Sequence, residues 1–170
     1  MTIYTIGHSN HEPDTFLQLL RQAQIDVLID VRSNPNSAWA PFANRDNLRN
    51  LLESTGIKYV YMGDTLGGQP SHQQSYKLQT GKVDYARIQE RASFKQSITK
   101  LLNESKKYKI CLMCAEENPI HCHRSLLISS ALTLSGAKIL HIRGDKRIQT
   151  DEEISKERAR VPLNQQRLPI

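Results

Sequence analysis

The sequence predicts a single α/β domain, in which a mostly parallel sheet of about five strands is covered by helices on both faces. Short apolar runs alternate along the chain with longer segments that carry apolar residues at helical spacing. The run DVLIDVR is almost continuously apolar, as expected for a parallel strand that is buried on both faces. Because 170 residues can close one core and no linker or internal repeat divides them, we expect one domain over residues 1–170.

Each element is predicted from its own pattern. Short apolar runs predict strands over residues 2–7, 26–32, 57–63, 108–114 and 137–143. Helical spacing, with Pro13 in a first turn, Asn44 as an N-cap and glycine stops at Gly56 and Gly136, predicts the helices. These helices cover residues 12–24, 44–56, 85–105 and 121–136, and the third is expected to break near Ser93. The segment 150–170 is predicted to start as a polar helix and to end as an irregular tail.

One long segment, residues 63–84, departs from this alternation. Its sequence, GDTLGGQPSHQQSYKLQTGKVD, is polar and rich in glycine and glutamine. Connections of this length in compact domains are usually functional lids or disordered segments. We therefore expect a lid-like loop that closes over a substrate.

Composition favours a soluble protein with anionic partners. The net charge is +6, but the basic residues are dispersed, so a large nucleic-acid groove is not favoured over a solvated surface. No apolar stretch reaches the roughly 18 residues of a membrane span, so no membrane partner is expected. The start, MTIYTIGHSN, lacks the pattern of an export signal, and we expect a cytoplasmic location. The sequence does not specify an oligomeric state.

Polar, titratable and glycine residues follow four of the predicted strands. Ligands bind at the carboxyl ends of parallel strands, so we expect these groups to share one edge of the sheet. They are His8, Ser9, Asn10, Asp30, Arg32, Gly67, Gly68, Cys114, Glu116, His121, Cys122, His123 and Arg124. Structural roles remain open for several: Asp30 can pair with Arg32, His8 can be a turn residue, and Trp39 is interpreted as a packing anchor.

The stretch CLMCAEENPIHCHRS contains all three cysteines of the chain. Cys111 and Cys114 are three apart on a predicted strand, so they should face opposite sides and Cys111 should belong to the core. Cys122 is expected in the first turn of the next helix, where free amides and the helix dipole stabilise a thiolate. Cys122 is therefore the preferred reactive thiol, with Cys114 as its neighbour, ligand or resolving thiol.

A metal site is the alternative interpretation of this stretch. Cysteine and histidine side chains are common zinc ligands, but a Cys-x2-Cys knuckle needs a tight turn, and here the motif lies on a strand. The remaining ligand set is Cys114 and Cys122 with His121 or His123, for zinc or iron. No cofactor is predicted under the preferred interpretation.

The motifs YTIGHSN, LIDVRSNPNS, GIKYVYMGDTLGG, VDYARI and LMCAEENPIHCHRSLL resemble, in order and spacing, the domain of unknown function 488 family. The resemblance covers about Ile3 to Arg143. It implies an α/β domain in which the strand-end residues above, apart from Asn10 and His121, lie at motif positions, but it implies no reaction. A weaker similarity to rhodanese-type domains is one of topology, because neither Cys114 nor Cys122 has the spacing to Arg124 of their Cys-x4-Arg loop. The implied arrangement is a Rossmann-like or rhodanese-like three-layer fold.

We therefore expect a small cytoplasmic enzyme, a thiol-dependent transferase or hydrolase, that acts on an anionic small molecule or a nucleotide or nucleic-acid component. Cys122 or Cys114 would supply the thiol, and His8 or His123 would transfer protons. Asp30 would have an orienting role. Substrate binding would fall to a second group of residues, namely Arg32, Arg124, Ser9, Asn10, Glu116, Gly67 and Gly68. A non-catalytic nucleotide- or nucleic-acid-binding module and a zinc or iron metalloprotein are the two alternatives.

Overall fold

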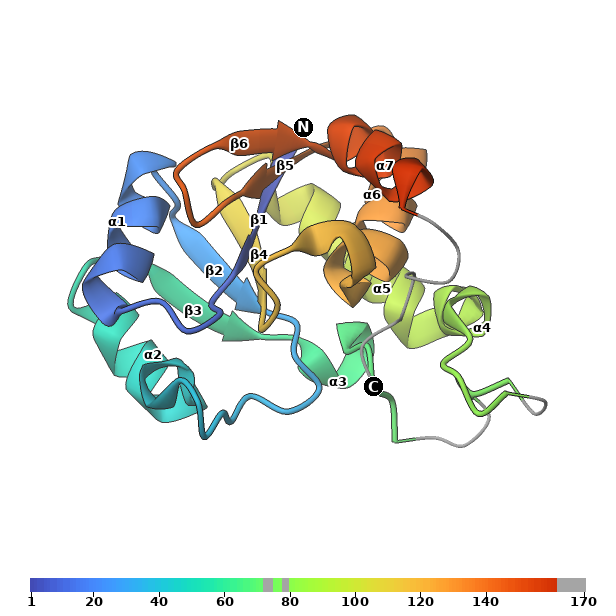
Figure 1. The fold of residues 1–170 in the computed structure, drawn as a ribbon, viewed down its shortest axis with the longest axis horizontal. Coiled ribbons are helices and arrows are strands. Elements are labelled where there is room, and N and C mark those ends of the chain that lie inside the picture. The colour runs from blue at the N-terminus through green and yellow to red at the C-terminus, as the bar shows by residue number, and fades with distance from the viewer. Residues whose placement is uncertain (72–74, 78–79, 162–170) are drawn as a thin grey trace.

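One sheet of six strands organises the computed structural model, which describes residues 1–71, 75–77 and 80–161 (Figure 1). The strands are β1 (Thr2–Gly7), β2 (Val27–Asp30), β3 (Lys58–Tyr61), β4 (Ile110–Cys114), β5 (Lys138–Ile142) and β6 (Ile148–Thr150). They lie in the order β3-β2-β4-β1-β5-β6. The first five strands pair in parallel and β6 pairs antiparallel with β5.

The predicted α/β class and mostly parallel sheet are thus confirmed, with one strand more than expected. The additional strand, β6, has only three residues and lies between charged residues. Three residues are too few to show the alternation of apolar and polar side chains that predicts a strand from sequence. Because it follows β5 through a tight reversal at Gly144–Arg147, it can pair antiparallel with its neighbour.

Helices cover both faces of the sheet (Figure 1). One face packs against α1 (Pro13–Gln22) and α2 (Arg45–Glu53) through Phe16, Leu20, Leu48 and Leu52. The other face packs against α4 (Tyr85–Glu90), α5 (Ala92–Glu104) and a π-helical segment, Arg124–Ser129, that continues into α6 (Ser130–Leu134). The last helix, α7 (Asp151–Arg160), lies beside β5 and β6.

Strand β4 shows how the two faces divide its side chains. Cys111 and Met113 belong to the core beneath α1 and α2, whereas Leu112 and Cys114 belong to the core on the opposite face. Successive side chains of a strand point to opposite faces, so this alternation follows from the strand itself. The predicted placement of Cys111 in the core, away from Cys114, is confirmed.

The connections after β1 and β4 leave the sheet on opposite faces. β1 leads to α1, and the neighbouring strand β4 leads to the helical segment on the other face. Such a divergence between adjacent parallel strands leaves a crevice at their carboxyl ends, where ligands of α/β proteins bind. The loop after β1 lies along the loop after β4, because the amides of His8 and Ser9 donate to the carbonyls of Cys114 and Ala115 at 2.9 and 2.8 Å.

The segment predicted as a lid-like loop, residues 63–84, is partly ordered into regular structure. It begins with α3 (Gly63–Leu66), and Tyr76 forms an antiparallel bridge with Val83. Residues 72–74 and 78–79 of this segment, and 162–170 of the predicted tail, lie outside the described residues. None of the helices in the described ranges is long and apolar enough to cross a membrane.

Candidate functional site

Four potential metal ligands converge at the crevice between β4 and the helical segment that follows it. They are Cys114, Glu116, Cys122 and His123, whose ligand atoms all lie within 4.8 Å of one another. The sulfur atoms of Cys114 and Cys122 are 2.7 Å apart, and Glu116 Oε2 lies 2.6 Å from the first and 3.2 Å from the second. The side chains of Cys114, Cys122 and His123 are buried, while that of Glu116 is partly exposed.

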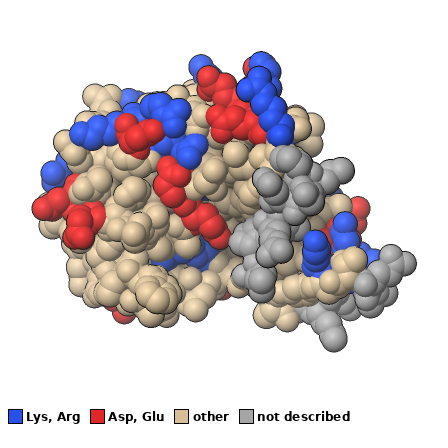
Figure 2. All heavy atoms as spheres, in the orientation of Figure 1, with Lys and Arg blue, Asp and Glu red and all other residues tan. Residues whose placement is uncertain are grey.

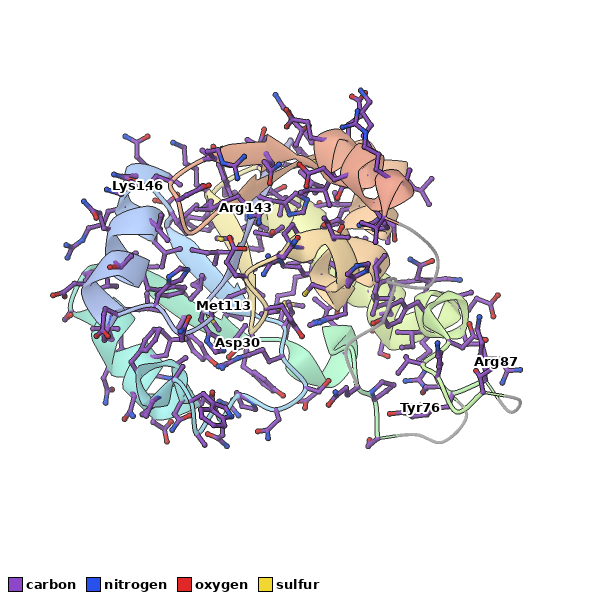
Figure 3. The ribbon with its side chains drawn as sticks, in the orientation of Figure 1. Asp30, Tyr76, Arg87, Met113, Arg143 and Lys146 are labelled. Carbon is purple, nitrogen blue, oxygen red and sulfur yellow. The ribbon has the colours of Figure 1, made fainter. Side chains whose placement is uncertain are left out.

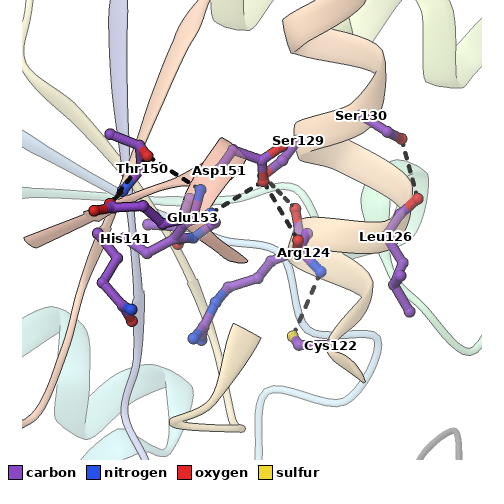
Figure 4. A network of polar contacts seen from close by, with 12 residues as sticks. Cys122, Arg124, Leu126, Ser129, Ser130, His141, Thr150, Asp151 and Glu153 are labelled. Atoms are coloured by element: carbon purple, nitrogen blue, oxygen red, sulfur yellow. Dashed lines mark hydrogen bonds and ion pairs between the residues drawn. The ribbon is translucent and has the colours of Figure 1, made fainter. Parts of the chain in front are cut away.

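Cys122 lies immediately before the helical segment rather than within its first turn. Its backbone is extended, its carbonyl oxygen accepts the amide of Ser125 at 3.0 Å, and its sulfur accepts the amide of Arg124 at 3.4 Å (Figure 4). The expected interaction of this sulfur with a helix amide is therefore present, one position earlier than predicted. Burial and the hydrogen bond with Cys114 nevertheless raise the pKa of the Cys122 thiol well above its ordinary value, so the free thiolate is not favoured.

His123 is held so that one ring nitrogen faces the sulfur atoms. Its Nε2 atom lies 3.0 Å from the carbonyl oxygen of Val31, and this contact places the ring proton on Nε2. Its Nδ1 atom, 3.8 Å from the Cys122 sulfur, is then an unprotonated acceptor. Burial lowers the pKa of His123 and favours this neutral form.

Gly68 provides the space for the His123 ring. A side-chain carbon at position 68 would lie 2.6 Å from both Cβ and Cγ of His123, closer than such atoms approach in proteins. Gly67 likewise packs on Ser33, whose hydroxyl accepts the amide of Gln69 at 2.9 Å. The paired glycines therefore fix the start of the loop against the cluster.

Arg124 lies behind the cluster rather than in an opening to solvent. Its side chain is fully buried, and it donates to the carbonyl oxygens of Glu116 and Glu117 at 2.5 Å each and to the Cys114 sulfur at 3.5 Å. Glu117 is fixed in turn by Arg143 at 2.9 Å. Gly7 leaves room for this loop, because a Cβ there would lie 1.8 Å from the Glu116 carbonyl oxygen. Arg124 thus shapes the loop that carries Glu116.

A second buried network surrounds Arg32. Its guanidinium forms two hydrogen bonds with the Asp30 carboxylate, at 2.9 and 2.7 Å, and donates to His8 Nε2 at 3.0 Å. Tyr59 also donates to Asp30, at 2.8 Å. Since His8 Nδ1 lies 2.8 Å from the carbonyl oxygen of Ser9, both of its ring nitrogens have protein partners. Burial lowers the pKa of His8, in agreement with a neutral ring.

The structure separates the predicted site residues. Cys114, Glu116, Cys122 and His123 form the cluster, and His8, Asp30 and Arg32 form the adjacent network. Asp30 and its register partner Met113 are labelled in Figure 3. Ser9 and Asn10 hydrogen-bond to each other at 3.2 Å in an exposed position, and His121 is not part of the ligand cluster. Trp39 is 93% exposed, so its interpretation as a packing anchor is wrong.

A pocket of about 540 Å³ opens beside the cluster. Glu116 and His123 form part of its wall, together with Arg32, Lys82, Tyr76 and Tyr85. Tyr76 comes from the hairpin of the loop segment, marked in Figure 3. The pocket thus reaches the cluster through Glu116 and His123, while Cys114 and Cys122 are fully buried behind them.

Two features of the site were not predicted. The Val31 carbonyl oxygen that orients His123 belongs to a backbone group, which carries no sequence signature. Tyr85 lies in the motif VDYARI, where the sequence indicates only the start of a helix. Its place on the pocket wall depends on how that helix packs.

The chain belongs to the DUF488 family of domains of unknown function, whose model matches residues 12–131. This match is shorter than the predicted range and leaves out the motif that contains His8 and Ser9. No functionally curated protein matches the chain. Among solved structures, it is similar to a DUF442 protein from Shewanella putrefaciens CN-32, with 18% identity, a TM-score of 0.44 and coverage of 78% of this chain and 62% of that chain. No activity follows from a similarity at this level.

Proposed function

We propose that the protein is a metal-dependent enzyme that holds one zinc or ferrous ion through Cys114, Cys122 and His123. The observation that carries this proposal is the convergence of two sulfur atoms, a carboxylate oxygen and an imidazole nitrogen within 4.8 Å. Thiolate, imidazole and carboxylate groups are the protein ligands of zinc, and three of them with one replaceable position are typical of catalytic sites.

The surroundings of His123 support the proposal further. Metal-binding histidines usually donate their other ring proton to a carboxylate or a backbone carbonyl, which fixes the tautomer and orients the ring. The contact from His123 Nε2 to the Val31 carbonyl oxygen is of this kind and leaves Nδ1 directed at the cluster.

Metal binding requires a small rearrangement of the thiols. Zinc lies about 2.3 Å from each thiolate, which places two sulfur ligands of a tetrahedral site roughly 3.7 Å apart. The sulfur atoms of Cys114 and Cys122 are 2.7 Å apart, so they must separate on binding. The ion replaces their protons, and this offsets the unfavourable ionisation of buried thiols.

Glu116 is the proposed replaceable ligand. It is the only partly exposed member of the cluster and it also lines the pocket. Although burial alone raises the pKa of Glu116, the hydrogen bonds from Cys114 and Cys122 lower it below its usual range, so the carboxylate is ionised. A metal at this position would act as a Lewis acid toward a substrate oxygen or a water molecule in the pocket.

The charge of the pocket supports an anionic substrate. Lys82 contributes a cationic group to its wall, whereas the charge of Arg32 is paired with Asp30. Glu116 contributes a carboxylate on the side of the proposed metal, whose positive charge would add to that of Lys82. On the face shown in Figure 2, acidic and basic side chains are interspersed, rather than gathered into one basic patch. A small anionic molecule, such as a nucleotide, fits this arrangement better than a long nucleic-acid strand.

Elemental analysis of protein purified without a histidine tag tests the proposal. Wild-type protein and the Cys111→Ala variant, whose substituted thiol lies on the opposite face of β4, are expected to carry about one zinc or iron per chain. Cys114→Ser, Cys122→Ser and His123→Ala are expected to lose most of it. Wild-type protein that contains no metal and takes up neither zinc nor ferrous ion would contradict the proposal.

A thiol-based function is the second candidate, favoured by the short distance between the sulfur atoms of Cys114 and Cys122. In this alternative, the two thiols transfer two electrons and two protons to an oxidant such as hydrogen peroxide, which becomes water, and they form a disulfide. Mass spectrometry after peroxide treatment distinguishes the two candidates. The thiol function requires a reversible loss of two hydrogens in protein that binds no metal, with Cys111 remaining free.

A further inference from the structure

Tyr85 differs from Tyr76, the other tyrosine that lines the pocket, and from two tyrosines of β3. Tyr76 donates its hydroxyl to the Pro70 carbonyl, and Tyr59 and Tyr61 donate theirs to Asp30 and to the Ser33 carbonyl. The hydroxyl of Tyr85 makes no hydrogen bond with any residue of the described ranges, although the residue lines the pocket. A polar group of a pocket-lining residue that has no protein partner is suited to contact a ligand.

The helix that carries Tyr85 is fixed to the segment that carries the cluster. Tyr85 is the first residue of α4, whose Ile88 is buried in the core. Gln89 donates from Nε2 to the Leu127 carbonyl at 2.9 Å and to the Ser130 hydroxyl at 3.0 Å, on the helix that begins just after His123. Tyr85 therefore keeps a defined position in the wall of the pocket that Glu116 and His123 also line.

Electrostatic coupling agrees with this position. Burial raises the pKa of Tyr85 to about 12, and the negative charge of Glu116 and, once they ionise, of Cys122 and Cys114 adds to this shift. The phenol consequently stays protonated near neutral pH and acts as a hydrogen-bond donor.

We propose that Tyr85 is a further catalytic residue of this site, whose hydroxyl donates a hydrogen bond to the substrate oxygen beside the metal. The inference rests on the proposed metal-dependent function and adds a second electrophilic group to the wall of the same pocket. Such a donor stabilises negative charge that develops on the oxygen during reaction. The ring of Tyr85 also packs against the core, so only the hydroxyl is assigned this role.

Cobalt-substituted protein allows a test that needs no knowledge of the natural substrate. Cobalt bound to thiolates absorbs visible light, and acetohydroxamate, an oxygen-donor probe, changes that absorption when it enters the coordination sphere. Tyr85→Phe removes the hydroxyl alone, and Tyr108→Phe is the matched control because Tyr108 is an exposed tyrosine distant from the pocket wall. Tyr85→Phe is expected to retain the cobalt spectrum and the unfolding temperature but to bind acetohydroxamate about ten-fold more weakly, whereas Tyr108→Phe binds it as wild type does.

The outcomes separate the inference from the function on which it rests. If cobalt gives no thiolate spectrum with wild-type protein, the metal-dependent function fails and the role of Tyr85 fails with it. If cobalt binds but Tyr85→Phe and wild type have equal affinity for acetohydroxamate, the role of Tyr85 alone is overturned. A cobalt protein that does not respond to acetohydroxamate also overturns it, because no replaceable position then faces Tyr85.

Discussion

The Nε2 atom of His123 lies 3.0 Å from the carbonyl oxygen of Val31. This contact joins the cluster to the residue that directly follows β2. This contact determines which nitrogen of the ring carries the proton. It leaves Nδ1 facing the sulfur atoms of Cys114 and Cys122. The proposed metal site therefore depends on the exact placement of one ring, and substitutions that move the ring should be more harmful to metal binding than to folding.

Gly68→Ala is the first such substitution. Its methyl group would lie 2.6 Å from Cβ and Cγ of His123, so the ring must shift. We expect about a 10- to 100-fold loss of zinc affinity, as found when the outer partners of metal ligands are changed. Competition with a chromophoric chelator measures the affinity, and Gln69→Ala, at the exposed neighbouring position, is the control. Equal zinc affinity in wild type and Gly68→Ala would show that the ring is not a ligand.

Arg124→Met should destabilise the fold itself. The methionine fills a similar volume but leaves the carbonyl groups of Glu116 and Glu117 without their donor. We expect a loss of about 3 kcal/mol in the free energy of unfolding, since each unsatisfied buried group costs about 1–3 kcal/mol. Urea denaturation measures it.

The control for this prediction is Arg147→Met. Arg147 pairs with Asp145 at 2.6 Å, but the side chains of both residues are more than half exposed. Such surface pairs contribute little to stability. If Arg124→Met proved as stable as Arg147→Met, Arg124 would not support the loop.

The metal-free protein should lose stability in mild acid. Burial lowers the pKa of His141, whose ring lies between the Thr5 hydroxyl at 2.7 Å and the Asp151 carboxylate at 3.1 Å. His141 and Asp151 are labelled in Figure 4. Between this lowered pKa and the ordinary value of 6.5, the unfolded chain binds more protons than the folded one. The contribution of the neutral His141 ring to the free energy of unfolding is therefore fully present above pH 6.5, and it decreases as the pH falls toward the folded-state pKa. His8 and His123, whose pKa values burial also lowers, contribute in the same direction.

Urea denaturation between about pH 7 and 5, in the presence of a chelator, checks the sign of this dependence. His141→Gln removes one of the three titrating groups and should have a shallower slope than wild type. A wild-type protein whose free energy of unfolding is constant or increases on acidification in this range would contradict the assignment of these histidines as buried and neutral.

The fold was predictable from the sequence because most elements have a clear period. The alternation along β4 placed Cys111 and Cys114 on opposite faces, and the rule for parallel sheets gathered the polar residues at one edge. β6 was not predictable, because three residues between charged neighbours show no period. The orientation of the helix α4, and hence the position of Tyr85, depends on tertiary packing rather than on local sequence.

The roles of the arginines illustrate a different limit of sequence patterns. Arg32 and Arg124 were expected to bind substrate, and the structure gives both of them protein partners, a carboxylate for Arg32 and two backbone carbonyl groups for Arg124. A sequence cannot show which carbonyl groups will be turned toward a guanidinium. The structure brings Cys114 and Cys122 beside Glu116 and His123, because β4 ends and the next helix begins there, although Cys122 precedes that helix instead of lying in its first turn.

X-ray absorption spectroscopy of the zinc-reconstituted protein is the most direct test of the central claim. The proposed site requires two sulfur ligands at about 2.3 Å and nitrogen or oxygen ligands at about 2.0–2.2 Å. Cys111→Ala should leave the spectrum unchanged, and the small fraction of zinc that Cys114→Ser still binds should show one sulfur scatterer fewer. A first coordination shell that contains only nitrogen and oxygen atoms would contradict a metal site built on Cys114 and Cys122.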